Sequence, residues 1–208
     1  MNISSISAVF SQGLLLGLSL IVAVGAQNAF VLRQGLKREH VGSIVLFCAL
    51  ADATLMTAGV MGMGQALGAS PYLARALALA GAAFLAVYGW RALQRARQAQ
   101  RLDATGTGAG ISCGAALTQA AAFTLLNPGV YLDTVLLVGS IGAQQAAPLR
   151  AWFVVGASCA SLGWFAALGY GARKLTPLFA RPGAWQVLDG ITAATMFLLA
   201  SLLVRHAW

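Results

Sequence analysis

The sequence predicts an all-α polytopic membrane protein, with six transmembrane helices arranged as an inverted repeat of two three-helix halves. Three observations support this fold class. Hydrophobic residues make up 59% of the 208 residues and charged residues only 9%, whereas a soluble domain has roughly 25% charged residues. Six apolar runs are long enough to cross a bilayer. The first helix of each half is interrupted by residues that do not suit a helix.

The six apolar runs occupy most of the chain, so we expect residues 1–208 to form a single transmembrane domain. The repeat halves are expected at about 1–93 and 112–208, joined by a cytoplasmic loop at 94–111. Because each half has an odd number of helices, the two halves have opposite orientations in the membrane. The six spans are expected at about residues 8–32, 41–64, 72–90, 112–143, 151–171 and 185–204.

Basic residues predict the orientation. Counted in alternate loops, ten of the 13 Lys and Arg residues fall on one side of the membrane. Cytoplasmic loops carry the excess of Lys and Arg, so we expect both termini in the periplasm of a multi-pass protein of the cell inner membrane. The net charge of +8 is thus interpreted as a topology signal. We expect no nucleic-acid partner, because the chain has no soluble basic module.

In the first half, the first span is interrupted at Gly25-Ala26-Gln27-Asn28, toward its cytoplasmic end. The second span carries Asp52 near its middle, where a carboxylate costs about 3 kcal/mol even on a lenient insertion scale. Asp52 is therefore expected to face the bundle interior or a cavity. The basic segment 91–101 is expected to be a solvated extension of the third helix that fixes the topology.

In the second half, the fourth span is interrupted at Asn127-Pro128-Gly129. A proline removes a backbone donor and clashes with the preceding turn, so the helix is expected to break there. Asp133 follows five residues later, roughly 8 Å along a helix. Asp189 lies near the cytoplasmic start of the sixth span, where interfacial solvation or stabilisation of the helix N-terminus is the favoured interpretation.

Two broken helices beside two membrane carboxylates indicate a ligand site. In lipid, a broken helix is tolerated only where it is buried in protein or lines a polar cavity. Paired broken helices of inverted repeats form the midplane binding sites of many transporters. The alternative is structural: each acid forms an ion pair with an arginine, or accepts a hydrogen bond from a freed backbone donor.

Other candidate residues carry no expected chemistry. The three cysteines, Cys48, Cys113 and Cys159, have no CxxC spacing, and no zinc-type spacing joins His40 or His206 to a carboxylate. We therefore expect no metal and no cofactor.

Glycines spaced four apart allow close helix packing in lipid. We expect these faces to meet within one bundle, with a homo-oligomer as the alternative. Trp164, deep in the fifth span, is interpreted as a packing residue. The glycine pairs are Gly13 with Gly17, Gly64 with Gly68 and Gly110 with Gly114.

These residues also carry a resemblance to a known family. The chain resembles the LysE-type exporters of lysine and arginine along nearly its full length. The matching stretches are residues 25–39, Ala51-Asp52, Ala58-Gly59, Leu126-Asn-Pro-Gly-Val-Tyr-Leu-Asp133, Ala157-Ser-Cys-Ala-Ser161 and Trp164-Phe165.

The resemblance implies a six-helix inner-membrane carrier that exports basic amino acids and is built from an inverted three-helix repeat. It places the first break and the acids of the second and fourth helices near the substrate path. Two positions depart from the family pattern. Ala26 stands where the family usually has Pro, which softens the expected break, and Leu125 stands where it usually has Trp.

A cationic amino acid needs acceptors for its positive groups and donors for its carboxylate. We assign Asp52 to the positive side chain or to a coupling proton, and Asp133 to the complementary role. Gln27, Asn28 and Asn127 are expected to orient the amino-acid backbone. Tyr131 completes the set of substrate-site candidates, and Gly25, Pro128 and Gly129 are assigned to the helix breaks.

The expected activity is secondary-active export of lysine or arginine by proton antiport, with no enzymatic chemistry. The nearest alternative is an efflux carrier of the same type for neutral or other amino acids. An intramembrane aspartyl protease is a less favoured alternative, because its Tyr-Asp pair and Gly-x-Gly-Asp motif do not occur here. A thiol-disulfide carrier would need a cysteine pair close enough to bridge. A channel would lack saturable exchange.

Overall fold

The computed structural model describes residues 2–22, 26–63, 71–97, 110–179 and 182–207, and every regular element within these ranges is helical. The predicted all-α class is therefore confirmed. Four helical segments are long and apolar enough to cross a membrane, at Ile3–Ile21, Val41–Gly62, Ala147–Leu175 and Gly183–Arg205. Two shorter apolar helices, Cys113–Leu125 and Asp133–Ala143, accompany them. The arrangement of six spans as an inverted repeat stays a prediction.

The first half contains the first predicted break. Helix α1 spans Ile3–Ile21, and α2 begins after a gap and spans Ala26–Lys37. Helix α3 spans Val41–Ala58 and continues as the short helix η1, Gly59–Met63. Helix α5 spans Pro71–Arg97 and so continues beyond the expected end of the third span, as the predicted extension requires.

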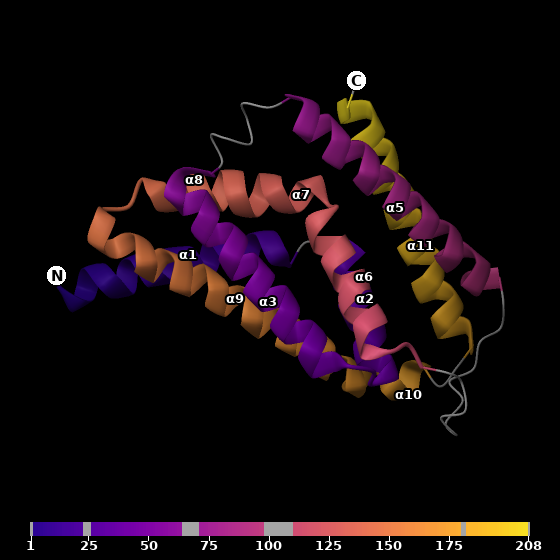
Figure 1. Cartoon of the computed structure of the whole chain (residues 1–208). Coiled ribbons are helices and arrows are strands. Elements are labelled where there is room, and N and C mark those ends of the chain that lie inside the picture. The colour runs from indigo at the N-terminus through magenta and orange to yellow at the C-terminus, as the bar shows by residue number, and fades with distance from the viewer. Residues whose placement is uncertain (1, 23–25, 64–70, 98–109, 180–181, 208) are drawn as a thin grey trace.

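The second half contains the second predicted break. Helix α6 spans Cys113–Leu125, and the chain then turns sharply into a helical segment that runs across it (Figure 1). That segment comprises α7 (Pro128–Val130), η2 (Tyr131–Val138) and α8 (Gly139–Ala143). The remaining elements are η3 (Ala147–Leu149), α9 (Arg150–Gly171), η4 (Ala172–Leu175), α10 (Thr176–Phe179) and α11 (Pro182–Ala207).

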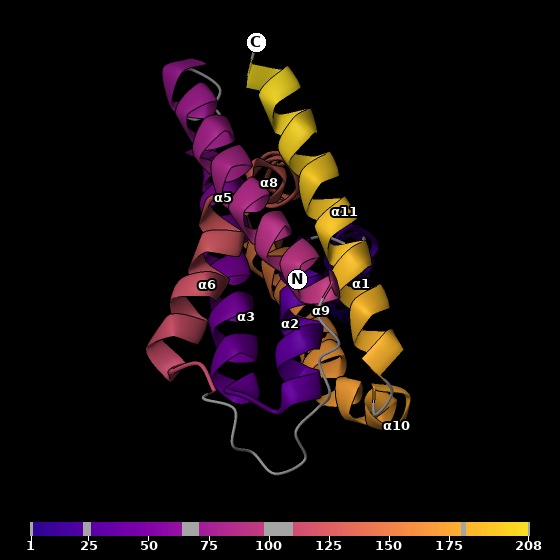
Figure 2. The same cartoon turned by 90° about the vertical axis from the view of Figure 1, so that its right-hand side faces the viewer.

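Two helix pairs form the frame of the molecule. Helix α1 lies along α9, which also packs against α3, and α5 lies along α11 (Figures 1 and 2). Glycines bring α1 and α9 into backbone contact: a Cβ built on Gly13 would lie 2.1 Å from the Phe153 carbonyl oxygen, and one built on Gly156 would lie 2.1 Å from the Phe10 carbonyl oxygen. The expectation that Gly13 and Gly17 pack within one bundle is thus confirmed. Gly64 and Gly68 lie outside the described residues.

An aromatic cluster holds α2, α5 and α6 together. The ring of Phe123 on α6 lies 5.2 Å from that of Phe30, 4.9 Å from that of Phe84 and 4.6 Å from that of Tyr88, measured between centroids. Edge-to-face and tilted pairs at such separations are favourable beyond the apolar area that they bury. The cluster fixes α2 beside α6, and so fixes the second half of one broken helix beside the first half of the other.

The described helix ends that border the loops predicted to be cytoplasmic lie at one end of the molecule, and most of the predicted loop at 94–111 is outside the described residues. The C-terminal end of α2, the N-terminal ends of α3 and α6, and α10 lie together at the lower end in both views (Figures 1 and 2). His40 Nε2 lies 2.9 Å from the Ile111 carbonyl oxygen, which ties the turn after α2 to the segment before α6. The orientation of this end in the membrane stays a prediction.

Candidate functional site

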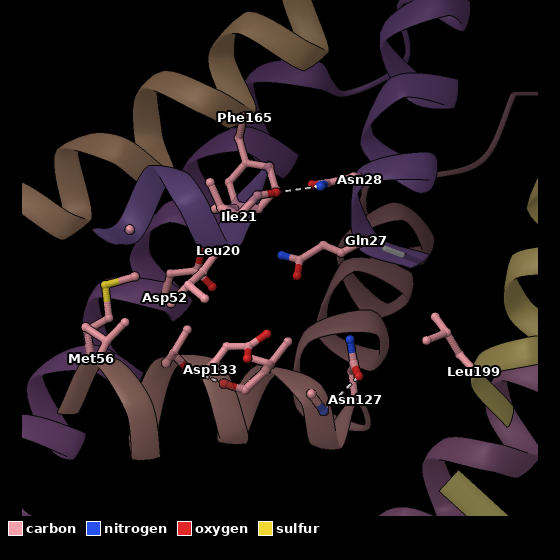
Figure 3. Close-up of a pocket in the computed structure, with 15 residues that line it drawn as sticks. Leu20, Ile21, Gln27, Asn28, Asp52, Met56, Asn127, Asp133, Phe165 and Leu199 are labelled. Atoms are coloured by element: carbon pink, nitrogen blue, oxygen red, sulfur yellow. Dashed lines mark hydrogen bonds between the residues drawn. The ribbon is translucent and has the colours of Figure 1, made fainter. Parts of the chain in front are cut away.

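A cavity of about 250 Å³ lies between the two helix breaks (Figure 3). Its size is close to the lower end of the roughly 300–1,000 Å³ range of small-molecule sites. Residues from both halves of the chain form its wall. Among the residues predicted for the site, those that line the cavity are Gln27, Asn28, Asp52, Asn127, Gly129 and Asp133.

The first break lies between Ile21 and Ala26, and its Gly25 is outside the described residues. Asn28 closes this break, because its Nδ2 donates a hydrogen bond to the Ile21 carbonyl oxygen at 2.7 Å. That carbonyl lies at the end of α1, where helical carbonyls lack intrahelical partners. The helix is interrupted here even though Ala26 replaces the Pro that the family usually has.

The second break lies between Leu125 and Pro128. The Asn127 Oδ1 accepts a hydrogen bond from the Gly129 N–H at 3.0 Å, which forms a local turn. Pro128 then begins the next helix, a position where its missing N–H costs little. The Tyr131 hydroxyl donates to the Leu125 carbonyl oxygen at 2.8 Å. Tyr131, a predicted substrate-site residue, is thus placed at the break and is absent from the cavity wall.

The two acids face the same space from opposite helices. Asp52 on α3 is only 3% exposed, and its Oδ2 accepts a hydrogen bond from the Ser161 hydroxyl at 2.7 Å. Asp133 lies on η2, and Figure 3 shows its carboxylate pointing toward the space that Asp52 and Gln27 also enter. Within the described ranges, neither acid forms an ion pair. The ion-pair alternative for these acids therefore finds no support in the structure.

The cavity wall has an unusual charge balance. Two carboxylates line it, and no Lys, Arg or His occurs among the described residues of its wall. Gln27 adds a donor, because its Nε2 is buried and makes no hydrogen bond to any other described residue. Gln27 and Asn28 lie in the first turn of α2, where the helix dipole is positive. The cavity can therefore attract a cation while offering donors for a carboxylate.

Asp189 shows that one sequence interpretation was wrong. It was expected to be solvated at the interface or to stabilise the helix N-terminus, yet it is 1% exposed and lies beyond the first turn of α11. The guanidinium groups of Arg33 on α2 and Arg95 on α5 both donate to its Oδ1, Arg95 at 3.2 Å. Arg95 is thus not part of the predicted solvated extension, although Arg91 and Arg97 are exposed. No local spacing indicated this cluster, because its residues come from three separate helices.

Two residues of α9 were missed as parts of the site. The Ser161 hydroxyl holds Asp52, and the Trp164 Nε1 donates to the Asn28 Oδ1 at 3.3 Å. Trp164 was expected only to pack. Both residues fall in the stretches that carry the family resemblance, and that was the one signal in the sequence that pointed to them.

The structure also bears on metal binding. No group of three or more His, Cys, Asp or Glu side chains in the described part of the chain could hold a metal ion.

Comparison with known proteins gives the family context. Residues 18–207 match the family model described as LysE type translocator. No solved structure matches the chain.

Several curated relatives match over most of both chains. The arginine exporter protein ArgO of Pectobacterium carotovorum subsp. carotovorum (strain PC1) is 39% identical over 201 residues, which are 97% of this chain and 98% of the relative. ArgO of Yersinia enterocolitica serotype O:8 is 39% identical over 199 residues, 96% of this chain and 97% of the relative. A Mycobacterium tuberculosis (strain H37Rv) protein, provisionally named an amino-acid transporter, is 43% identical over 179 residues, 86% of this chain and 88% of the relative.

Proposed function

The chain belongs to the LysE type translocator family of amino-acid exporters, and we propose that it exports the basic amino acids arginine and lysine across the cell inner membrane. The observation that carries this proposal is the cavity between the helix breaks, which has two carboxylates and no basic side chain among the described residues of its wall. The relatives named as arginine exporters support the same substrate class.

The polar groups of the cavity match the three charges of such a substrate. A basic amino acid carries an ammonium group, a carboxylate and a cationic side chain. Asp52 and Asp133 accept from the two cationic groups, and the Gln27 Nε2 donates to the carboxylate, which is also favoured by the positive end of the α2 dipole. Asn127 lies on the wall beside the second break and helps to orient the amino-acid backbone.

Proton exchange is the proposed driving force. Moving one positive charge outward against an inside-negative potential costs about 2.3 kcal/mol per 100 mV. An inward proton cancels that charge movement, and either cavity acid can carry it. Alternating access between two inverted three-helix halves would expose the cavity to each side in turn.

The proposed orientation places both termini in the periplasm. The Gln145 Nε2 lies 3.3 Å from the Gln12 Oε1, which puts the middle of α1 beside the segment between α8 and η3. That segment belongs to the less basic set of loops. A reporter that is active only in the cytoplasm should be inactive when it is fused at the N-terminus. An active fusion would show that α1 has the opposite orientation to the one proposed.

Proteoliposomes with purified protein test the transport proposal. We expect arginine and lysine to exchange saturably with internal arginine. In vesicles without internal amino acid, net uptake of either substrate should drive an opposite proton movement that a trapped pH dye reports. Threonine and leucine should compete at least tenfold less well. Apolar residues such as Met56 and Phe165 also line the cavity, and they favour the alternative of a neutral amino acid as substrate. Exchange of leucine with the same efficiency as arginine would support that alternative and contradict the export of basic amino acids. Net arginine transport without proton movement would remove the antiport step alone.

A further inference from the structure

Many serine and threonine hydroxyls on the described helices of this protein have the same kind of hydrogen-bond partner. They donate to a carbonyl three or four residues earlier in their own helix, as hydroxyls in apolar helices commonly do. Those that follow this pattern are Ser7, Ser19, Thr54, Thr57, Thr118, Thr124, Thr134, Ser140, Thr192 and Ser201. Ser161 does not. It donates across a helix interface to a carboxylate of the proposed substrate cavity.

The bond from Ser161 restrains the Asp52 carboxylate. Ser161 is buried on α9, and its hydroxyl lies 2.7 Å from the Asp52 Oδ2. Within the described chain this is the one hydrogen bond that Asp52 makes. Asp52 also lines the cavity. One carboxylate oxygen is therefore held against α9, which leaves the other free to meet a ligand.

Trp164 restrains the amide of Asn28 in a similar way. Its Nε1 donates to the Asn28 Oδ1 at 3.3 Å, and the Asn28 Nδ2 in turn donates to the Ile21 carbonyl oxygen at 2.7 Å. Because an indole N–H can only donate, it determines which end of the amide faces α9. The amide nitrogen is then directed to the end of α1.

A single face of α9 makes both contacts. Ser161 and Trp164 are three residues apart, so they lie on the same side of the helix. Helix α9 is itself held firmly, because Gly17 of α1 lies in close contact with the Ala157 backbone. It can therefore support α3 and the start of α2 together, without supplying the polar groups that meet the substrate.

We propose that Ser161 and Trp164 are positioning residues, which orient Asp52 and Asn28 toward the cavity from a rigid α9. Their effect on transport rests on the proposed function; the orientation itself does not. The free energy of a hydrogen bond to a charged group is large enough that its loss changes the binding affinity about tenfold. A hydrogen bond between neutral groups contributes less free energy.

The first experiment compares transport kinetics in proteoliposomes. Ser161→Ala should raise the KM for arginine about tenfold with Vmax nearly unchanged, and Ser161→Thr, which keeps the hydroxyl, should restore it to within about twofold. Trp164→Phe should raise the KM about threefold. The matched controls lie on the same helix: the Ser158 hydroxyl has no hydrogen-bond partner in the described structure, and Trp152 is exposed. Ser158→Ala and Trp152→Phe should match the wild type.

Equal KM values for Ser161→Ala and Ser158→Ala would overturn the role of Ser161. Equal values for Trp164→Phe and Trp152→Phe would overturn that of Trp164. A Ser161→Ala variant that loses activity through misfolding is recognised by size-exclusion chromatography, and the Thr variant then decides the outcome. Failure of Ser161→Thr to transport like the wild type, in a folded protein, would also count against the proposal.

The second experiment needs no transport. A hydrophobic carbodiimide modifies membrane carboxyl groups, and mass spectrometry reports the rate at Asp52. Ser161→Ala frees the second carboxylate oxygen and should speed the modification at least threefold, whereas Ser158→Ala should not. If the wild type transports neither arginine nor lysine, the proposed function is wrong, and this rate still decides whether Ser161 orients Asp52. Equal rates in the two variants would show that it does not.

Discussion

The two helix breaks are closed by the same kind of bond, made in different ways. In each, a polar side chain beyond the break donates to the last carbonyl of the preceding helix: Asn28 to Ile21, and Tyr131 to Leu125. The second break is otherwise local, with the Asn127 turn and Pro128 both within its own sequence. The first break depends on α9, because Trp164 holds the Asn28 amide.

This difference separates a structural break from a functional one. The closing residue of the first break, Asn28, also lines the cavity, whereas that of the second, Tyr131, does not. Substitutions at the first break should therefore affect transport and the packing of several helices. Substitutions that remove only the Tyr131 hydroxyl should affect stability alone.

The largest expected effect concerns the anchor of α2, the helix that follows the first break. Asp189→Asn leaves the buried guanidinium of Arg33 and that of Arg95 without their carboxylate, a loss of about 3–5 kcal/mol in the free energy of unfolding. The melting temperature of the detergent-solubilised protein should fall clearly. Lys37 is an exposed residue of α2, so Lys37→Gln is the control and should melt like the wild type. Equal melting temperatures for the two variants would show that the cluster does not hold α2.

The next effect compares the two cavity acids. Asp52→Asn should reduce arginine transport at least about 100-fold, because the substitution removes a buried negative charge that pairs with a positive group of the substrate. Asp133→Asn should cost about tenfold, since Asp133 is more exposed and solvent replaces part of its interaction. Transport is measured in proteoliposomes with equal amounts of folded protein. Normal export by Asp52→Asn would remove that residue from the mechanism.

A smaller effect is expected at the residue that closes the first break. Asn28→Ala loses the bonds to Ile21 and Trp164 and one polar group of the cavity wall. Arginine transport should fall about tenfold, with a loss of stability of about 1–2 kcal/mol. Thermal unfolding and transport are measured on the same preparation. A variant that is destabilised but transports normally would make Asn28 purely structural.

The smallest effect is expected at the second break. Tyr131→Phe removes only the hydroxyl that donates to the Leu125 carbonyl, and should lower the free energy of unfolding by about 1 kcal/mol. The KM for arginine should stay within about twofold of the wild-type value. A tenfold rise in KM would return Tyr131 to the substrate site and would contradict the contrast between the breaks.

The sequence predicted the elements of this fold better than their contacts. Composition and the length of the apolar runs were enough to predict the all-helical class, because a helix that crosses the bilayer needs about 20 consecutive apolar residues. The break at Pro128 followed from proline chemistry, and that near Gln27 from polar residues in an apolar run. Asp52 and Asp133 were found because a carboxylate in lipid needs a polar environment.

Contacts between distant segments were the part that sequence reasoning could not reach. Asp189 was assigned to the interface or the helix N-terminus because it lies near the cytoplasmic start of the sixth span, whereas its partners come from α2 and α5. Ser161 resembles any helical serine until α9 is packed against α3. Tyr131 sits in the same motif as Asp133, yet helical geometry turns one toward the break and the other toward the cavity.

The sequence by itself determined where the helices break and that Asp52 must be sheltered, because both follow from local chemistry and the cost of polar groups in lipid. Only the tertiary structure decided which side chains hold those groups in place. Ser161 is the partner of Asp52, Trp164 is one partner of Asn28, and Arg33 and Arg95 are the partners of Asp189. Each of these residues lies more than ninety residues from its partner along the chain, and packing alone brings them within hydrogen-bond distance.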